Sequence, residues 1–220
     1  MTNPIKASFK TEIIPIILIL LSIAASFYFY ANFPPTVATH WNYKGDVDGW
    51  SSKAFAAFFF PFFNIALYLL FLGIPYLDPK KDRYEQFAKV YHVFKNLFVI
   101  FMTAIYFLVG LAGLGYDVSV GSIVPASVGI LFIILGNYMG KIKSNWFMGI
   151  RTPWTLSNEE VWNKTNRLGG KIFILIGILL IVGIVLPPMV FWQLFIIGML
   201  IIVLVPMIYS FLLYKKLEKK

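Results

Sequence analysis

The sequence predicts an all-α integral membrane protein with six transmembrane helices and with both termini in the cytoplasm. Its composition is the first observation behind this class. Hydrophobic residues make up 59% of the 220 positions and charged residues only 13%, whereas a soluble domain carries about 25% charged residues. The mean hydropathy is +0.77. Most of this chain is therefore expected to be surrounded by lipid.

Six apolar runs supply the second observation, because about 20 residues cross the roughly 30 Å hydrocarbon core of a bilayer. The first run is longer than the core of a secretory signal, which has about 7 to 15 residues, so we expect it to be retained as a helix. Pro187 and Pro188 separate the last two runs and predict a short turn. The predicted spans are Ile13–Phe33, Ala54–Leu77, Leu97–Tyr116, Ser122–Gly140, Ile172–Leu186 and Met189–Tyr214.

The distribution of charge predicts the orientation of these spans. Of the 19 Lys and Arg residues, all but Lys44 and Lys53 fall in segments on one side of the membrane. Cytoplasmic loops of membrane proteins carry such an excess of basic residues, so this side and both termini are predicted to be cytoplasmic. The net charge of +9 is thus a topology signal. Direct nucleic-acid binding is not expected, because no basic cluster sits on a soluble domain.

The predicted spans contain no Asp, Glu, Lys, Arg or His, which argues against a pump or an ion-coupled transporter. Their few polar residues, such as Asn64, are expected to form hydrogen bonds between helices. Gly136 and Gly140 have the spacing of close helix packing, and two interpretations stay open: contact inside the bundle or a homodimer. The absence of Cys excludes disulfides and thiolate chemistry.

A polar loop over residues 34–53 lies between the first two spans and is predicted to be extracellular. It is rich in turn formers, and Ser51 or Ser52 can cap the second helix. One interpretation is a compact cap anchored at the headgroups by its aromatic residues, and the other is a binding surface for an external ligand. No complete calcium loop follows its two aspartates, and we expect no metal. The candidate toxin-binding residues are His40, Trp41, Asn42, Asp46, Asp48 and Trp50.

The cytoplasmic stretch from Lys80 to Asn96 predicts an amphipathic helix. Tyr84, Phe87, Tyr91 and Phe94 recur at three- and four-residue steps, with charged residues around them. We expect this helix to lie on the inner leaflet.

A second cytoplasmic segment, residues 141–171, is unusually rich in Trp and in Asn and Thr side chains. Ser157 and Glu160 have capping-box spacing and predict a helix from about Asn158. Two interpretations of Arg151 stay open: a salt bridge to Glu159 or Glu160, or contact with lipid phosphate. The segment either folds as a plug under the bundle or docks a partner. We find no nucleophile and base, and expect no catalytic residue and no cofactor. Its candidate residues, for partner docking or for structure, are Asn145, Gly149, Arg151, Thr152, Pro153, Trp154, Glu160, Trp162 and Asn166.

These features divide the chain into four predicted parts. Residues 1–77 form a module of two membrane helices with the extracellular loop 34–53. Residues 78–121 hold the amphipathic helix and the third membrane helix. Residues 122–214 contain the last three membrane helices with the cytoplasmic loop 141–171, and residues 215–220 form a basic cytoplasmic tail.

The segment from Asn145 to Arg167 resembles the signature of the SdpI family of bacterial immunity membrane proteins, on two motifs. These are Gly149 to Ser157 and Trp162 to Arg167. The outer loop, from Thr39 to Lys53, is similar to an uncharacterised extracellular module that commonly precedes this signature.

The resemblance implies a six-helix protein that protects its cell against a secreted membrane-active toxin peptide. In the founding system the family also holds an ArsR-type transcriptional repressor at the membrane. Membrane lipids, the toxin peptide and such a repressor are the partners that it implies. The alternative hypothesis is a small-molecule or lipid permease, or an enzyme with reactive groups at Arg151, Glu159 and Glu160.

Overall fold

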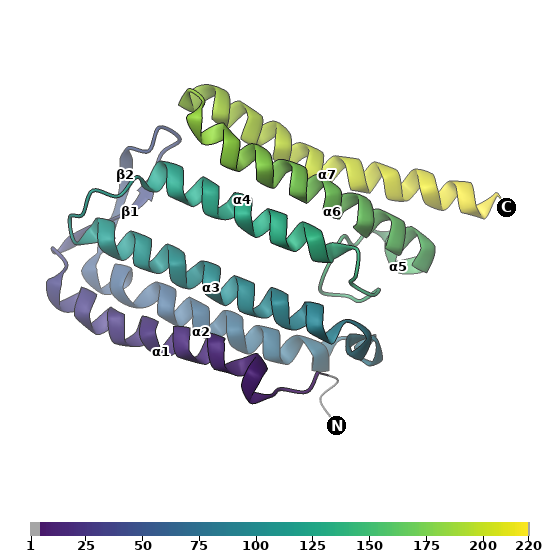
Figure 1. The fold of residues 1–220 in the computed structure, drawn as a ribbon, viewed down its shortest axis with the longest axis horizontal. Coiled ribbons are helices and arrows are strands. Elements are labelled where there is room, and N and C mark those ends of the chain that lie inside the picture. The colour runs from purple at the N-terminus through teal and green to yellow at the C-terminus, as the bar shows by residue number, and fades with distance from the viewer. Residues whose placement is uncertain (1–4, 220) are drawn as a thin grey trace. The chain divides into compact units, whose positions relative to one another are not determined.

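The computed structural model describes residues 5–219, and within them the predicted all-α class is confirmed. Six helices in this described part of the chain are long and apolar enough to cross a membrane. Between them lie a short helix, two 3-10 helices and one β-hairpin (Figure 1). The elements are α1 Phe9–Asn32, β1 Thr36–Trp41, β2 Val47–Ser52, α2 Lys53–Leu77, η1 Lys81–Phe87, α3 Ala88–Gly113, α4 Val120–Met139, α5 Pro153–Ser157, α6 Glu159–Val182, η2 Gly183–Val185 and α7 Pro188–Glu218.

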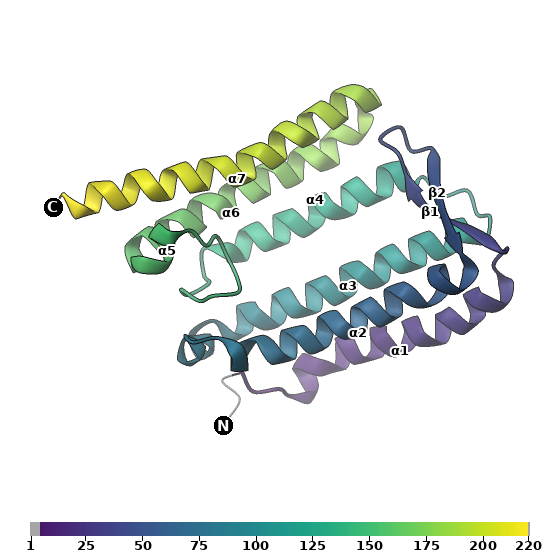
Figure 2. The ribbon, with the colours of Figure 1, turned by 180° about the vertical axis from the view of Figure 1, so that it is seen from behind.

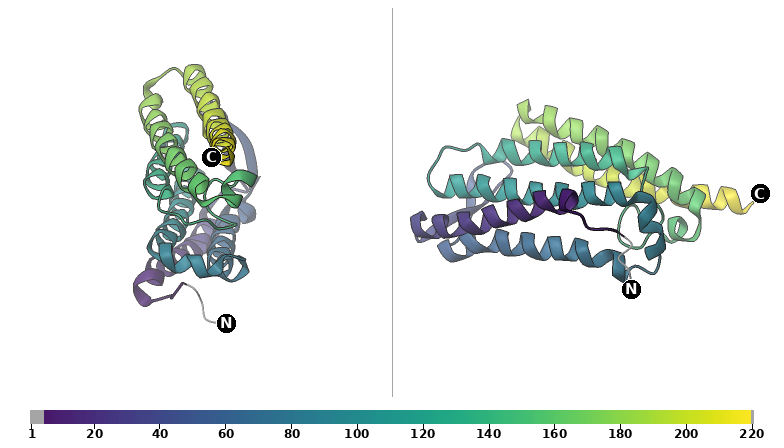
Figure 3. Two further views of the ribbon diagram at one scale, coloured as in Figure 1. Left: turned by 90° about the vertical axis from the view of Figure 1, so that its right-hand side faces the viewer. Right: turned by 60° about the horizontal axis from the view of Figure 1, so that its bottom comes forward.

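The chain forms two compact units. The hairpin unit comprises residues 7–72 and 93–127, and the C-terminal unit comprises residues 5–6, 73–92 and 128–219. In the hairpin unit, α1 and the adjoining parts of α2 and α3 run side by side, with β1 and β2 at one end (Figure 2). In the C-terminal unit, α6 and α7 form a helical hairpin (Figure 3).

The predicted turn at Pro187 and Pro188 is confirmed, because α6 continues into η2 and α7 begins at Pro188. Pro188 occupies the first turn of α7, where its missing N–H leaves no helical hydrogen bond unmade. The predicted capping of α2 is also confirmed, since the Ser52 hydroxyl accepts the N–H of Phe55 at 3.3 Å. The predicted tail continues α7 as far as Glu218, and Lys220 lies outside the described residues.

Two of the long helices begin before the predicted spans and carry an ion pair there. Glu12 lies in the first turn of α1 and Lys95 lies in α3, and the two side chains form an ion pair that is almost completely buried. The Tyr68 hydroxyl on α2 donates to the Glu12 carboxylate at 2.7 Å. Hydropathy placed the start of each span too late, because a charge lowers the local average even where a partner neutralises it.

A second buried polar contact links α2 and α3 in the hairpin unit. The Asn64 amide donates to the carbonyl of Val99 at 3.3 Å and to the hydroxyl of Thr103 at 3.0 Å. Asn64 therefore forms the hydrogen bonds between helices that were predicted for the polar residues of the spans.

The prediction of a separate amphipathic helix over residues 80–96 is wrong. Residues 81–87 form the 3-10 helix η1, and the following residues belong to α3, which continues as one of the six long helices. The aromatic stripe is buried in protein, and it consists of Tyr84, Phe87, Tyr91 and Phe94. A stripe at helical spacing indicates an apolar environment, but it does not distinguish lipid from the core of a protein.

Glycines bring α4 and α6 into backbone contact within the C-terminal unit. A Cβ atom on Gly136 would lie 2.5 Å from the carbonyl oxygen of Gly170, and one on Gly129 would lie 2.6 Å from that of Gly177. Gly136 therefore packs inside the bundle, which is one of the two interpretations of its spacing.

Candidate functional site

The predicted outer loop folds as the antiparallel hairpin of β1 and β2, which hydropathy and turn residues did not predict. Thr36 pairs with Ser52 at its base, and Trp41 pairs with Val47 near its tip. The register shifts twice between these points, so that Thr39 in β1 and Asp48 in β2 are each one extra residue. Such bulges redirect side chains from the regular ladder and are frequent at functional sites.

The bulge in β2 brings Asp48 against His40. The Nδ1 atom of His40 lies 2.5 Å from a carboxylate oxygen of Asp48, and their side chains are 71% and 44% exposed. Trp50, further along β2, is 62% exposed. Three of the predicted binding residues thus present an imidazole, a carboxylate and an indole to the surroundings.

The other predicted residues of this loop have different positions. Asn42 and Asp46 form the turn, since the Asn42 side-chain oxygen accepts the N–H groups of Lys44 at 2.8 Å and Asp46 at 3.1 Å. Gly45 has a φ of 88°, a left-handed conformation that glycine adopts without strain. Trp41 is half-buried. These side chains are suited to holding the shape of the tip.

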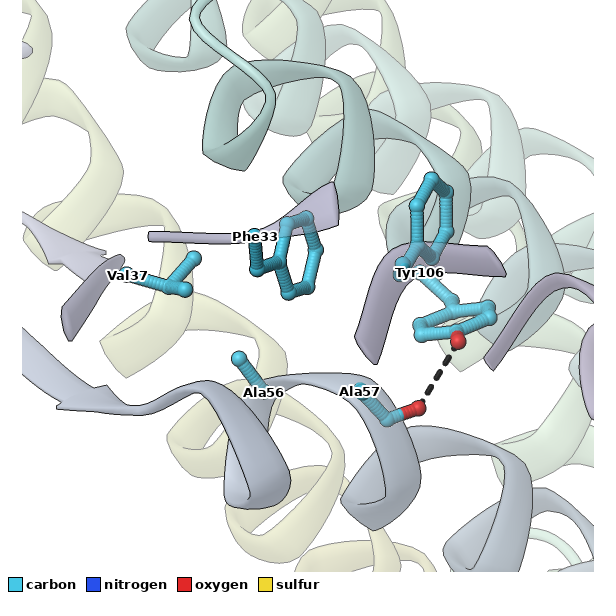
Figure 4. Packing of buried hydrophobic residues seen from close by; sticks show 6 residues of the cluster. Phe33, Val37, Ala56, Ala57 and Tyr106 are labelled. Carbon is cyan, nitrogen blue, oxygen red and sulfur yellow. Dashed lines mark hydrogen bonds between the residues drawn. The ribbon is translucent and has the colours of Figure 1, made fainter. Parts of the chain in front are cut away.

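The base of the hairpin is fixed in the core of the hairpin unit. Val37 of β1 is 1% exposed and packs with Phe33 and Ala56, and Tyr106 donates to the carbonyl of Ala57 at 2.7 Å (Figure 4). The hairpin is therefore an exposed surface on a rigid support, which lowers the entropic cost of binding a ligand.

The segment 141–171 is the second candidate site, and it lies in the C-terminal unit. Thr152 caps α5 by accepting the N–H of Thr155 at 3.1 Å, and Pro153 follows at the first position of the helix. The predicted cap at Ser157 is wrong, because Ser157 ends α5 and Asn158 caps α6. The Asn158 side chain accepts the N–H groups of Glu160 and Val161, which leaves no role for a serine cap.

Asn145 organises the loop before α5. It is completely buried, its side-chain oxygen accepts the N–H groups of Phe147 and Met148, and its amide donates to the carbonyls of Lys143 and Met148. All its hydrogen-bonding capacity is thus used within the loop. A buried amide with a full set of partners contributes to structure.

Gly149 and Asn166 depend on each other. The Asn166 side-chain oxygen accepts the N–H of Ile150 at 2.8 Å. Gly149 has a φ of 96°, and a Cβ atom there would lie 2.6 Å from that same oxygen. Glycine is therefore required at position 149 both by backbone conformation and by space.

Two of the three Trp residues of the segment pack within the C-terminal unit, whereas Trp146 is exposed. Trp162 on α6 is completely buried, and its indole N–H donates to the carbonyl of Ile142 at 2.8 Å. Trp154 on α5 packs against the ring of Phe211 on α7, with centroids 5.0 Å apart. Trp162 and Asn166 are thus unsuited to an exposed docking face, whereas Arg151 and Glu160 are exposed.

The charged residues of this segment have partners other than those predicted. Glu159 pairs with Arg83 of η1 at 3.3 Å, and Glu160 pairs with Lys164 one turn along α6 at 2.6 Å. Arg151 donates to the carbonyl of Trp146 at 2.5 Å. These groups point to separate partners and form no common reactive centre. Within residues 5–219, no three His, Asp or Glu side chains are grouped to hold a metal ion.

Two residues that were not predicted from the sequence connect this segment to the residues that follow α2. Asp78 is buried and accepts hydrogen bonds from the hydroxyl of Tyr84 at 2.8 Å and from the N–H of Trp146 at 2.9 Å. Lys80 donates to the hydroxyl of Ser144 at 2.8 Å. One signal for Asp78 is present in the sequence, since it is an acidic residue directly before a proline at the end of a predicted span.

Two family models match the chain in the order of its two candidate sites. Residues 17–65 match a domain of unknown function (DUF1648), and residues 141–210 match the SdpI/YfhL protein family. The chain is also 30% identical over 173 residues to the Immunity protein SdpI of Bacillus subtilis (strain 168), and these residues make up 79% of this chain and 81% of that protein. This chain belongs to the SdpI family. No solved structure matches it.

The predicted family resemblance is thereby confirmed, and so is the prediction of a multi-pass protein of the cell membrane. The hairpin falls within the first matched region of this SdpI-family chain. The segment from Asn145 to Arg167 falls within the second.

Proposed function

We propose that this SdpI-family chain protects the cell that makes it from a secreted membrane-active peptide, and that the β1–β2 hairpin recognises this peptide on the outside. An immunity function in the membrane is supported by the family membership of the chain and by the name of its B. subtilis relative. Nothing in the arrangement of Arg151, Glu159 and Glu160 favours an enzyme, since each pairs separately.

The exposed pair of His40 and Asp48 is the observation that carries recognition by the hairpin. The pair sits at the bulge of the hairpin, and Trp50, two residues further along β2, has an exposed indole. Aromatic and charged side chains on a fixed support are the usual anchors of a binding surface. Asp48 offers a carboxylate to a cationic group of a peptide, and Trp50 offers a large apolar contact.

Tolerance of a sensitive cell tests this function. The host is a B. subtilis strain that lacks its own SdpI. Two preparations of concentrated secreted peptides serve as probes, one from strain 168 and one from the strain that encodes this chain. Expression of the wild-type chain should raise the tolerated peptide concentration. Asp48→Asn and Trp50→Ala should each lower it by about tenfold, which corresponds to about 1.4 kcal/mol of binding free energy.

The matched control is Asp82→Asn, which removes an exposed carboxylate of η1 and should leave tolerance unchanged. Membrane levels of all variants are compared by immunoblot. A chain in which residues 40–50 are replaced by Gly and Ser, and which reaches the membrane and still protects fully, would show that recognition lies elsewhere.

We also propose that the segment 141–171 docks a cytoplasmic repressor of the ArsR type through its exposed charged residues. Arg151 and Glu160 are the charged residues of the predicted docking set, and both are exposed. Arg151→Ala should release a bound repressor from isolated membranes and leave peptide tolerance intact. Release by Lys141→Ala to the same extent would instead indicate non-specific attraction to basic charge.

A further inference from the structure

The exposed face of α2 next to the hairpin consists of phenylalanines. Lys53 begins α2 directly after β2, and five rings follow at steps of three, one, three and one residues, which places them on one side of the helix. All five are exposed, and they are Phe55, Phe58, Phe59, Phe62 and Phe63. We call this set, with the exposed Phe27 and Tyr30 of α1, the aromatic strip.

Most rings of the aromatic strip contact a neighbouring ring, in two sets. Phe55 stacks on Phe59 with centroids 4.6 Å apart, and Phe59 lies 6.0 Å from Phe63. Phe58 lies 5.6 Å from Phe27 and 5.5 Å from Tyr30 of α1. The strip therefore consists of one set of rings stacked along α2 and a second set that joins α2 to α1.

The strip reaches deeper than an interfacial belt. Ten residues of helix separate Lys53 from Phe63, which corresponds to about 15 Å at about 1.5 Å per residue and to half of the roughly 30 Å core. Aromatic belts consist of Trp and Tyr at the level of the headgroups. An interfacial belt explains the exposed position of Tyr30, but it does not explain exposed phenylalanines as deep as Phe62 and Phe63.

Lipid solvation does not account for the strip either. Phe and Leu have similar insertion free energies at the centre of a bilayer, so lipid gives no preference for rings. The same face of α2 changes to Leu69 and Leu70 in the half that is distant from the hairpin, where both are exposed. Exposed phenylalanines of α2 are thus confined to the half that adjoins the hairpin, and the exposed ring of the other half is Tyr76, close to the end of the helix.

We propose that the aromatic strip binds the apolar part of the toxin peptide while that peptide lies in the outer leaflet. This inference rests on the proposed immunity function and assigns a second contact surface to it. Phenylalanine rings have few rotamers to lose and offer large contact areas to an apolar helix or strand. A peptide that enters the outer leaflet meets the hairpin at the headgroups and the strip directly below it.

Exchange of rings for leucine tests the strip while it keeps the face apolar. A triple variant, Phe58→Leu, Phe59→Leu and Phe62→Leu, should lower tolerance to the secreted peptides of strain 168, or of the strain that encodes this chain, by about tenfold. Its membrane level should equal that of wild type. The matched control, Leu69→Ile with Leu70→Ile, changes the same face in the other half and should protect fully.

Photo-crosslinking identifies the occupant of the strip. Benzoyl-phenylalanine is placed at Phe62 in one variant and at Leu69 in another, and the cells are illuminated with the secreted peptides present or absent. Position 62 should form an adduct that contains a secreted peptide by mass spectrometry, and position 69 should not. Adducts with lipid alone, or with a second copy of this chain in the absence of peptide, would overturn the inference.

The outcomes for the strip and for the hairpin are distinguishable. If Asp48→Asn loses tolerance while the triple leucine variant protects fully, the immunity function stands and the strip is not a contact surface. If the wild-type chain gives no protection against either peptide preparation, the proposed function itself fails.

Discussion

Replacing Lys95 by methionine tests whether the buried ion pair holds the helices of the hairpin unit together. Lys95 on α3 contacts the carboxylate of Glu12 on α1, and Tyr68 on α2 donates to the same carboxylate. Methionine keeps much of the length of the side chain and removes its charge. The Glu12 carboxylate then loses the ammonium group that contacts it.

The size of the effect follows from two independent arguments. Removal of one partner from a buried ion pair costs about 3 to 5 kcal/mol. Alternatively, the Glu12 carboxyl group takes up a proton in the folded variant. Because glutamic acid in water has a pKa of about 4.3, this protonation costs about 4 kcal/mol at pH 7 and about 1 kcal/mol at pH 5. We expect Lys95→Met to lower the free energy of unfolding by about 3 to 4 kcal/mol at pH 7 and by about 1 kcal/mol at pH 5.

The measurement is equilibrium unfolding of the purified chain in detergent micelles, followed by Trp fluorescence at both pH values. Lys89→Met is the matched control, because Lys89 is an exposed lysine of the same helix, and it should change stability by less than about 0.5 kcal/mol. Combining Lys95→Met with Glu12→Gln removes both charges and should restore most of the loss. Equal stability of Lys95→Met and wild type at pH 7 would refute the reasoning, and a deficit of the same size at pH 5 would assign the loss to packing.

Three further predictions concern packing and topology. Gly136→Ala should destabilise the C-terminal unit by about 1 to 3 kcal/mol, because the new Cβ would meet a backbone carbonyl. The control Gly73→Ala should not, because its Cβ would meet nothing within 4 Å. Thermal unfolding in micelles compares the two variants. Trp162→Phe leaves a buried carbonyl without its donor and should cost about 1 to 3 kcal/mol, with the amount of folded protein read by size-exclusion chromatography. For topology, a Cys at Gly45 should react with an impermeant maleimide in intact cells and a Cys at Leu156 should not; labelling at Leu156 would reverse the proposed orientation.

The helices could be predicted from the sequence because hydropathy over about 20 residues is a local property. Their starts could not, since Glu12 and Lys95 look like the polar flanks of two separate spans until the fold brings them together. A charge that is neutralised by a residue 83 positions away gives no local signal.

The hairpin was missed for a different reason. A half-buried strand is recognised by strict alternation of apolar and polar residues, and the bulges at Thr39 and Asp48 interrupt it in both strands. The site residues of the hairpin were found by residue type, but their pairing was not. The contact of His40 with Asp48 depends on the register, which the sequence does not reveal.

In the segment 141–171 the important residues could be selected from the sequence, but their roles could not. Asn145 and Asn166 are polar residues that bind backbone groups inside the segment, and Asn166 reaches an N–H 16 residues away. A buried amide and an exposed docking amide have the same sequence pattern. Only the folded structure distinguishes a buried structural asparagine from one that faces a partner.

The two bulges of the hairpin shift the register in opposite directions, so that Thr39 and Asp48 can be deleted together without changing the pairing on either side. The pairs Ala38 with Trp50 and Trp41 with Val47 follow the same register, and between them each strand carries a single surplus residue. Deleting Thr39 alone, or Asp48 alone, would shift one strand by a residue and turn the side chains of its far end to the opposite face. Deleting both would restore an uninterrupted ladder with base and tip unchanged. Relatives that gained or lost these residues as a pair would thus keep the scaffold while exchanging the chemistry it displays.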